Sequence, residues 1–101
     1  VTSLKRSAAM PDVPTVAELG YPDFDVRVWY GLLAPANTPA PIIQTLNKEL
    51  NNILALQDVQ NALAAQGATA MPTTPAQFSQ TIAADHKKWR AVVEAAKVKL
   101  E

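Results

Sequence analysis

Six of the eight prolines of this chain lie between residues 11 and 41, together with two of its three glycines. Proline fixes φ at about −65° and has no amide hydrogen to donate, so closely spaced prolines interrupt helices and sheet ladders. This third of the sequence is therefore predicted to form stiff, largely irregular connections. Regular helices are expected only after it.

One run inside this stretch, residues 24–34, has the period of a β-strand. Its even-numbered positions form one apolar face, and its odd-numbered positions form a second face that begins with charged residues and ends with apolar ones. Because adjacent strand residues point to opposite faces, Trp29 and Tyr30 are expected on opposite sides of a sheet. Either both rings are packed under helices, or one of them faces a cleft or a partner. The apolar side chains on the first face are Phe24, Val26, Val28, Tyr30 and Leu32.

Two segments precede this strand. Residues 1–9 are predicted to contain the end of another strand, and residues 10–23 form a proline-rich connector. Within the connector, Thr15 and Glu18 have the spacing of a capping box. A helix of one turn, residues 16–19, is predicted to follow this cap.

The part after residue 38 is predicted to be mainly helical, because its apolar residues recur every three or four positions. The pair Thr-Pro occurs twice at an expected helix start, where threonine can cap free amides and proline is tolerated in the first turn. The predicted helices run from Pro39 after the cap Thr38 to about Leu56, from the cap Asp58 to Gly67, and onward from the cap Thr74, with a short strand at 68–71 before the last.

The composition favours neither catalysis nor nucleic-acid binding. Nine basic and nine acidic residues give no net charge, and no basic cluster suits a phosphate backbone. The absence of cysteine excludes disulfides and thiolate metal sites. His86, the single histidine, is expected at the edge of an apolar helix stripe, and the glycines form no phosphate-binding motif. We therefore predict no enzyme activity, no metal and no cofactor.

Seven short segments, in order and at their spacing, resemble a known family. They are VTS followed by KRS, PDVPTVAELGYPDF, WYGLLAPANTPAP, LNKEL, LAAQGA, TPAQF and the tryptophan of KKWRAVV. Together they resemble the distal part of the Bug-type periplasmic solute-binding proteins, which serve tripartite tricarboxylate transporters. The resemblance extends over essentially the whole chain.

The resemblance implies an α/β fold class, in which this chain is a partial lobe of a two-lobed, type II-like periplasmic binding protein with helices packed on a small mixed sheet. It also implies a longer protein whose export signal lies in the missing N-terminal part. The two lobes would close over a small carboxylated solute, such as a di- or tricarboxylate, an amino acid or an aromatic acid. The membrane transporter subunits would be the partners, and no catalytic step is implied.

By position near the hinge, Thr2, Ser3, Trp29 and Tyr30 are the candidate ligand-binding residues. Most of the family's ligand-anchoring loops would lie outside this chain. The alternative is a truncated interaction module that oligomerises through exposed sheet and helix faces and binds no small molecule. The isolated chain is then predicted to be dimeric or strand-swapped.

The expected organisation is a single partial domain, residues 1–101. Its parts are a hinge-strand end at 1–9, a proline-rich connector at 10–23, a strand at 24–34 and a C-terminal helical part at 38–101.

Overall fold

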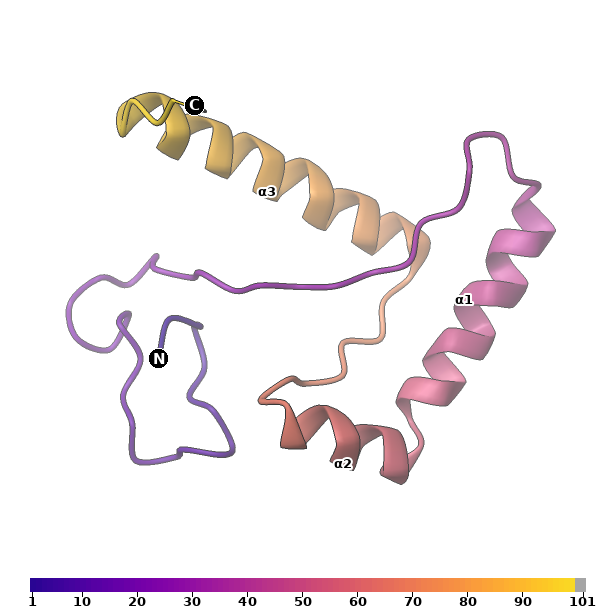
Figure 1. The fold of residues 1–101 in the computed structure, drawn as a ribbon, viewed down its shortest axis with the longest axis horizontal. Helices are drawn as coiled ribbons and strands as arrows, with labels where there is room; N and C mark the ends of the chain where they lie inside the picture. Colours follow the sequence, from indigo (N-terminus) through magenta and orange to yellow (C-terminus); the bar gives the residue numbers. More distant parts are fainter. Residues whose placement is uncertain (100–101) are drawn as a thin grey trace.

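The computed structural model describes residues 1–99 and shows three helices after a long non-helical segment (Figure 1). The helices are α1 (Ala40–Leu54), α2 (Gln57–Ala65) and α3 (Pro75–Ala95). Residues 24–34 cross the middle of the molecule as extended chain, with α3 above them and with α1 and α2 to the right and below (Figure 1). The predicted helical part ran to residue 101, and its last two residues lie outside the described ones.

The prediction of helices packed on a small mixed sheet is wrong, because residues 1–99 contain no strand. Residues 24–34 are extended, as their period indicates. The amides and carbonyls of residues 27–34, however, form no hydrogen bond within the described part of the chain. An alternating pattern sets which way side chains point, but a strand also needs a neighbouring backbone to bond. For the same reason the strands predicted within 1–9 and at 68–71 are absent.

Isolated backbone bonds hold the first residues in place without forming a sheet. The amide of Val16 donates to the carbonyl of Val1 at 3.0 Å, and the amide of Val26 donates to the carbonyl of Thr2 at 2.8 Å. The nitrogen of Val1 donates to the carbonyl of Pro14 at 2.7 Å. The start of the chain therefore lies between the proline-rich connector and the beginning of the extended segment.

The capping box predicted in the connector is present, but the helix after it is not. The amide of Glu18 donates to Thr15 Oγ1 at 3.0 Å, and the amide of Thr15 donates to Glu18 Oε2 at 2.7 Å. Residues 16–20 form turns. Gly20, at φ 114°, ends them before a helical ladder can propagate, and so short a segment cannot offset the cost of nucleation.

Of the two Thr-Pro pairs, only the second caps a helix. Thr74 accepts a hydrogen bond from the amide of Gln77 at 3.2 Å and forms the N-terminal capping box of α3. Thr38 was predicted to cap α1, but the N-cap residue is Pro39. The hydroxyl of Thr38 instead donates to the carbonyl of Pro35 at 2.8 Å.

The C-terminal end of α2 follows the sequence prediction, whereas its N-terminal cap does not. Asp58 was predicted as its cap, but the N-cap residue is Leu56. Asp58 lies in the first turn instead, where a carboxylate interacts favourably with the helix dipole. Gly67 adopts a φ of 71° just past the last turn. The amide of Gly67 then bonds the carbonyl of Ala64 at 3.0 Å, and the amide of Ala68 bonds that of Leu63 at 2.9 Å. This pair of bonds is a Schellman motif.

The described residues do not enclose an apolar core. Within residues 1–99, Thr15 is the single buried residue, although 49% of the sequence is hydrophobic. The solvent-accessible surface is 8604 Å², compared with about 5,600 Å² expected for a compact monomer of this mass. The radius of gyration is 16.6 Å, compared with about 13 Å for a compact domain of this length. The elements are therefore arranged openly, with their apolar faces uncovered.

Candidate functional site

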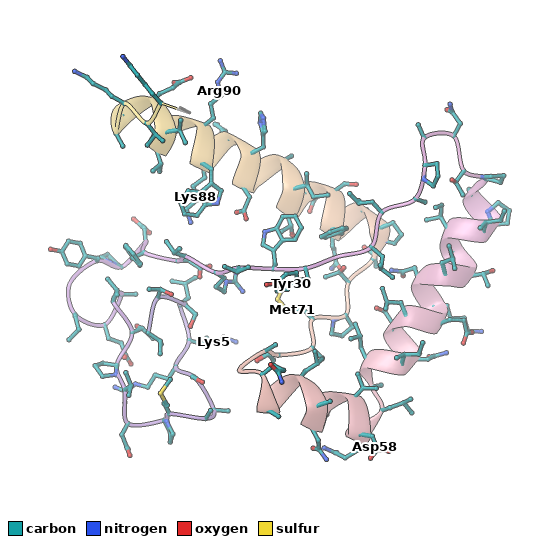
Figure 2. The ribbon with its side chains drawn as sticks, in the orientation of Figure 1. Lys5, Tyr30, Asp58, Met71, Lys88 and Arg90 are labelled. Carbon is teal, nitrogen blue, oxygen red and sulfur yellow. The ribbon has the colours of Figure 1, made fainter. Side chains whose placement is uncertain are left out.

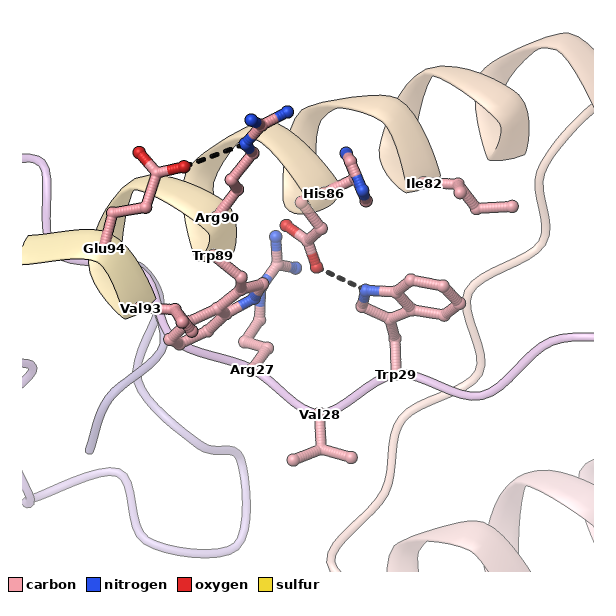
Figure 3. Close-up of a pocket in the computed structure, with 10 residues that line it drawn as sticks. Arg27, Val28, Trp29, Ile82, His86, Trp89, Arg90, Val93 and Glu94 are labelled. Atoms are coloured by element: carbon pink, nitrogen blue, oxygen red, sulfur yellow. Dashed lines mark hydrogen bonds and ion pairs between the residues drawn. The ribbon is translucent and has the colours of Figure 1, made fainter. Parts of the chain in front are cut away.

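The extended segment is fastened to α3 at Trp29 (Figure 3). The indole Nε1–H donates to Asp85 Oδ2 at 2.5 Å. The same ring meets Phe78 edge-on, with ring centroids 5.3 Å apart and an interplanar angle of 86°. Since Phe78 and Asp85 are two helical turns apart, both lie on one face of α3. Trp29 therefore sets the register of the segment along this helix.

Gly31 allows the segment to approach α3 closely. A Cβ atom at this position would lie 2.2 Å from Cζ of Phe78 and under 3.0 Å from both neighbouring ring atoms. No side chain fits into this space without moving the ring. The glycine is thus required by the close approach of backbone and ring, not by a turn.

Charged groups join the beginning of the extended segment to its surroundings. The carboxylate of Asp25 accepts hydrogen bonds from Arg27 Nη2 at 2.8 Å and from the amide of Leu4 at 3.3 Å. The carbonyl of Asp25 accepts from the ammonium group of Lys88. Lys88 also lies over the ring of Trp89, 5.2 Å from its centroid. These contacts give α3 a second attachment to the segment.

An open hollow of about 550 Å³ lies between the extended segment and α3 (Figure 3). Trp29 and Trp89 contribute its aromatic surfaces, and His86 also lines it. Its charges are largely balanced. Arg90 is paired with Glu94 at 3.0 Å, and Arg27 is paired with Asp25 at 2.8 Å. The hollow is therefore mainly apolar and does not concentrate positive charge for an anion.

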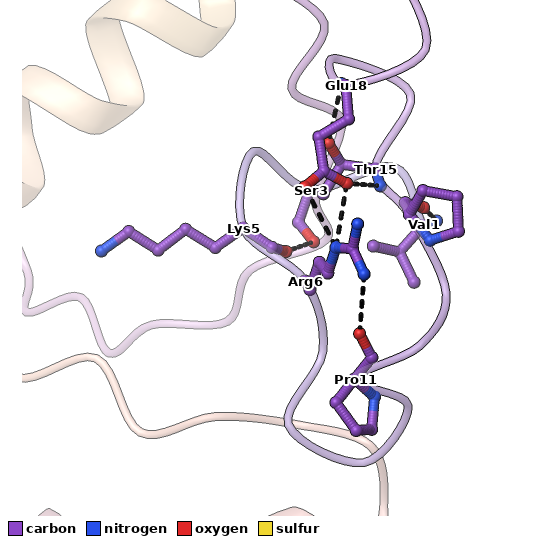
Figure 4. Close-up of polar contacts among 8 residues, drawn as sticks. Val1, Ser3, Lys5, Arg6, Pro11, Thr15 and Glu18 are labelled. Carbon is purple, nitrogen blue, oxygen red and sulfur yellow. Dashed lines mark hydrogen bonds and ion pairs between the residues drawn. The ribbon is translucent and has the colours of Figure 1, made fainter.

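A second polar cluster closes the N-terminal loop (Figure 4). Arg6 Nε lies 3.0 Å from each carboxylate oxygen of Glu18, and Arg6 Nη1 donates to the carbonyl of Pro11 at 3.0 Å. The hydrogen bond from the backbone of Thr15, followed by that from Arg6, lowers the pKa of Glu18. Both side chains of the ion pair are exposed, so water screens their attraction. The cluster holds a loop and leaves no buried polar site.

The structure does not bring the four candidate ligand-binding residues together in one pocket. Trp29 lines the hollow beside α3, whereas Thr2, Ser3 and Tyr30 do not. Thr2 is exposed. Ser3 is half-buried and donates its hydroxyl to the carbonyl of Lys5 at 2.7 Å. Tyr30, in the middle of the extended segment (Figure 2), is almost fully exposed. Their role as a ligand site stays a prediction.

Sequence reasoning did not identify three residues that let Trp29 and its neighbours contact α3. They are Gly31, Phe78 and Asp85. Gly31 carried a usable signal, since an isolated glycine inside a strand pattern marks a close approach of backbone. Phe78 carried only the signal of an apolar residue in a helical period, which does not indicate its partner. Asp85 had no signal, because its partner Trp29 is 56 residues away in sequence.

Residues 1–99 contain neither a candidate metal site nor a candidate membrane span. No group of three or more histidine, aspartate or glutamate side chains in this range could bind a metal ion. None of the helices in the same range combines the length and apolar character of a membrane span.

Comparison with known proteins assigns the family. Residues 1–98 match the model of the tripartite tricarboxylate transporter family receptor. The chain belongs to this family. The resemblance drawn from the sequence segments is thereby confirmed. By its description, this family consists of receptors of tripartite tricarboxylate transporters.

Curated relatives match this chain over almost all of its length. Protein BugT of Bordetella pertussis is 42% identical over 101 residues, which are 100% of this chain and 31% of the relative. A UPF0065 protein from the tcbD-tcbE intergenic region of Pseudomonas sp. strain P51 is 35% identical over 92% of this chain and 28% of its own length. A UPF0065 protein of Agrobacterium vitis is 39% identical over 93% and 26%. The chain therefore spans less than a third of the length of each of these relatives.

Proposed function

We propose that this chain is a portion of a periplasmic receptor that captures a small carboxylated solute and delivers it to the membrane subunits of a tripartite tricarboxylate-type transporter. The match of residues 1–98 to the receptor family carries the proposal. The uncovered apolar faces support the status of a portion, since a complete domain of this size would bury a core. The solute is a di- or tricarboxylate, an amino acid or an aromatic acid.

In the whole receptor, capture is a closure of two lobes around the solute. A carboxylate is held best by backbone amides and hydroxyl groups in fixed positions, because charge-assisted hydrogen bonds are short and strong. A solute that bridges both lobes binds the closed state better and shifts the population towards it. The membrane subunits then recognise the closed, loaded form.

The contacts of the four candidate residues refine their proposed roles. Thr2 is exposed, so its hydroxyl can donate to a carboxylate. The hydroxyl hydrogen of Ser3 is used by a carbonyl, which leaves the oxygen of Ser3 as an acceptor. The N–H of Trp29 is used by Asp85, so this residue can offer a solute only its ring surface. Tyr30 offers both its ring and its hydroxyl.

A chimeric receptor provides the test. In it, the segment of the Bordetella pertussis relative that matches this chain is replaced by these 101 residues. Calorimetric titration with a panel of di- and tricarboxylates, amino acids and aromatic acids is expected to give heat with at least one of them. Thr2→Val is expected to weaken that binding about tenfold, the loss of one hydrogen bond to a charged group. Thr45→Val, on the exposed side of α1, is the matched control. A folded chimera that binds none of the panel contradicts the proposal.

A second function is favoured by the amount of uncovered apolar surface. In this alternative the chain is an assembly module that associates with copies of itself and binds no small molecule. The unpaired backbone of residues 27–34 and the first three residues would pair or exchange between copies. Light scattering is expected to show a dimer or a larger species under this alternative. A monomer that unfolds cooperatively would exclude it.

A further inference from the structure

The basic residues of this chain are concentrated at the end of α3. Residues 86–99 contain five basic residues and one acidic residue, whereas residues 1–85 contain four basic and seven acidic ones. The chain as a whole has no net charge, because acidic residues elsewhere offset this end. The prediction of no basic cluster is therefore too general. The five basic residues of the cluster are Lys87, Lys88, Arg90, Lys97 and Lys99.

The outer face of α3 carries part of this charge. Lys87, Arg90 and Glu94 follow one another at intervals of three and four residues, so they share one face of the helix. Lys87 lies about 200° around the helix axis from Asp85, whose side chain contacts the extended segment. Figure 2 shows Arg90 pointing away from that segment. The outer face is thus turned away from the hollow and from Trp29.

Most of these cations are available to a partner. Lys88 is used within the chain, since its ammonium group donates to a backbone carbonyl of the extended segment. Arg90 is paired with Glu94, but their side chains are 72% and 66% exposed, so water screens the pair. The basic residues of the cluster that take part in none of the ion pairs within residues 1–99 are Lys87, Lys97 and Lys99.

Lys97 has a backbone conformation that lysine rarely adopts. Its φ is 52°, and the amides of Lys97 and Val98 bond the carbonyls of Glu94 and Val93 at 3.2 Å and 3.1 Å. These two bonds form a Schellman motif like the one that ends α2, where Gly67 has the left-handed conformation. Glycine adopts this conformation with less strain than lysine. Lysine at this position therefore adds a positive charge to the helix end at a cost in backbone strain.

The composition of the cluster indicates the class of partner. Four of its five basic residues are lysines. Protein interfaces are enriched in arginine and aromatic residues and depleted in lysine, which argues against an acidic protein. A surface of anionic phospholipids attracts lysine and arginine alike and needs no fixed geometry. A cluster of about four to eight such residues beside or on a helix is typical of binding to this kind of surface.

We propose that the basic end of α3, residues 86–99, docks on a bilayer surface that contains anionic phospholipids. The proposal rests on the proposed function, since a receptor that delivers a solute to membrane subunits works beside a bilayer. Lys87 and Arg90 reach the lipid headgroups from the outer face of the helix, and Lys97 and Lys99 reach them from its end. Because these cations are exposed, salt screens their attraction and the docking is reversible.

Co-sedimentation with lipid vesicles tests the proposal. The 101-residue chain is expected to bind phosphatidylglycerol vesicles at least about tenfold more tightly than phosphatidylcholine vesicles, and added salt is expected to remove the difference. Equal binding to both kinds overturns the proposal, because the uncovered apolar faces would bind either one. No binding to either kind also overturns it. Binding to polyglutamate but not to phosphatidylglycerol vesicles overturns it in favour of an acidic protein.

Two double variants with the same change in net charge locate the surface. Lys87→Gln combined with Lys97→Gln is expected to weaken binding to phosphatidylglycerol vesicles about 25-fold, or about fivefold for each lysine. Lys5→Gln combined with Lys48→Gln is the matched control, since both lysines are exposed and lie outside the cluster. Equal losses in the two double variants overturn the proposal, because net charge and not the end of α3 then determines binding.

Lys97→Gly separates the charge of Lys97 from its place in the helix end. Glycine adopts a φ of 52° without strain, so the variant is expected to keep or increase the helix content measured by circular dichroism. Binding to phosphatidylglycerol vesicles is expected to weaken about fivefold. Unchanged binding overturns the role proposed for Lys97.

The docking surface and the proposed function can fail separately. Vesicle binding is measured without a solute, and the calorimetric titration of the chimera is made without vesicles. A chain that binds phosphatidylglycerol vesicles while the chimera binds no carboxylate contradicts the proposed function and supports the docking surface. A chimera that binds a carboxylate while the chain ignores the vesicles supports the function and excludes the docking surface.

Discussion

The three helices and the extended segment 24–34 differ in where their backbone hydrogen bonds go. Each helix bonds its own backbone within a few residues, and α3 also closes its first turn with the Thr74 capping box. The extended segment has almost no backbone partner and is held by side chains of α3. Both regions have a clear hydrophobic period. A hydrophobic period alone therefore does not ensure that the backbone of an element is hydrogen-bonded.

The difference shows what a chain without a core can still specify. A helix needs mainly local bonds, although it gains most of its stability from packing. A strand needs a second strand, which can come from any distance along the polypeptide. Residues 24–34 are therefore extended and in register with α3, but within the described residues they have no partner strand. The following predictions test how far the two regions are independent.

The largest effect is expected from Gly31→Val. Its Cβ would overlap the ring of Phe78, so the segment should lift from α3 at a cost of about 1–3 kcal/mol, typical of overpacking. The fluorescence of Trp29 should shift to the red, while helix content measured by circular dichroism stays constant. Adding Phe78→Ala makes room and should restore part of the docking. A parallel loss of helix content would show that the two regions are not independent.

Asp85→Leu is expected to have the next largest effect. The variant removes the acceptor for the indole N–H of Trp29, at a cost of about 1.5 kcal/mol for a partly exposed bond to a charged group. Asp85→Asn keeps an acceptor oxygen and should recover most of the loss. Urea unfolding followed by tryptophan fluorescence measures both variants. If asparagine is as damaging as leucine, charge and not the hydrogen bond holds the segment.

Sequence reasoning predicted several local features and few long-range ones, and among the local ones the caps at Thr38 and Asp58 and the helix at 16–19 were wrong. The cap at Thr74, the capping box at Thr15 and the end of α2 at Gly67 were confirmed, because each depends on residues within a few positions. The sheet was not, since its partner strands are not specified by any period. The Trp29–Asp85 bond could not be predicted either, because the two residues meet only after 56 residues of chain have folded back.

Thr74→Ala should have a smaller and purely local effect. The variant removes the side-chain cap of α3 and should cost about 1 kcal/mol of helix stability. Thr38→Ala is the matched control, because Thr38 also precedes a proline but does not cap α1. Circular dichroism should show a loss of helix for the first variant and none for the second. An equal loss would mean that the Thr-Pro sequence, and not the observed cap, sets the helix start.

The smallest effect is expected on the stability of the N-terminal loop at acidic pH. The hydrogen bond from the Thr15 backbone and the contact with Arg6 lower the pKa of Glu18 from its usual value of 4.5. The loop is therefore stabilised above pH 4.5, and this contribution is lost as the pH falls through the lowered pKa. Arg6→Gln should raise the pKa of Glu18 towards 4.5, whereas Lys5→Gln, which removes a charge that does not contact Glu18, should change it less. Carboxyl NMR titration measures both.

Because the ion pair is exposed, added salt should also raise the pKa of Glu18. A salt-independent pKa would show that the hydrogen bond from the Thr15 backbone alone sets it.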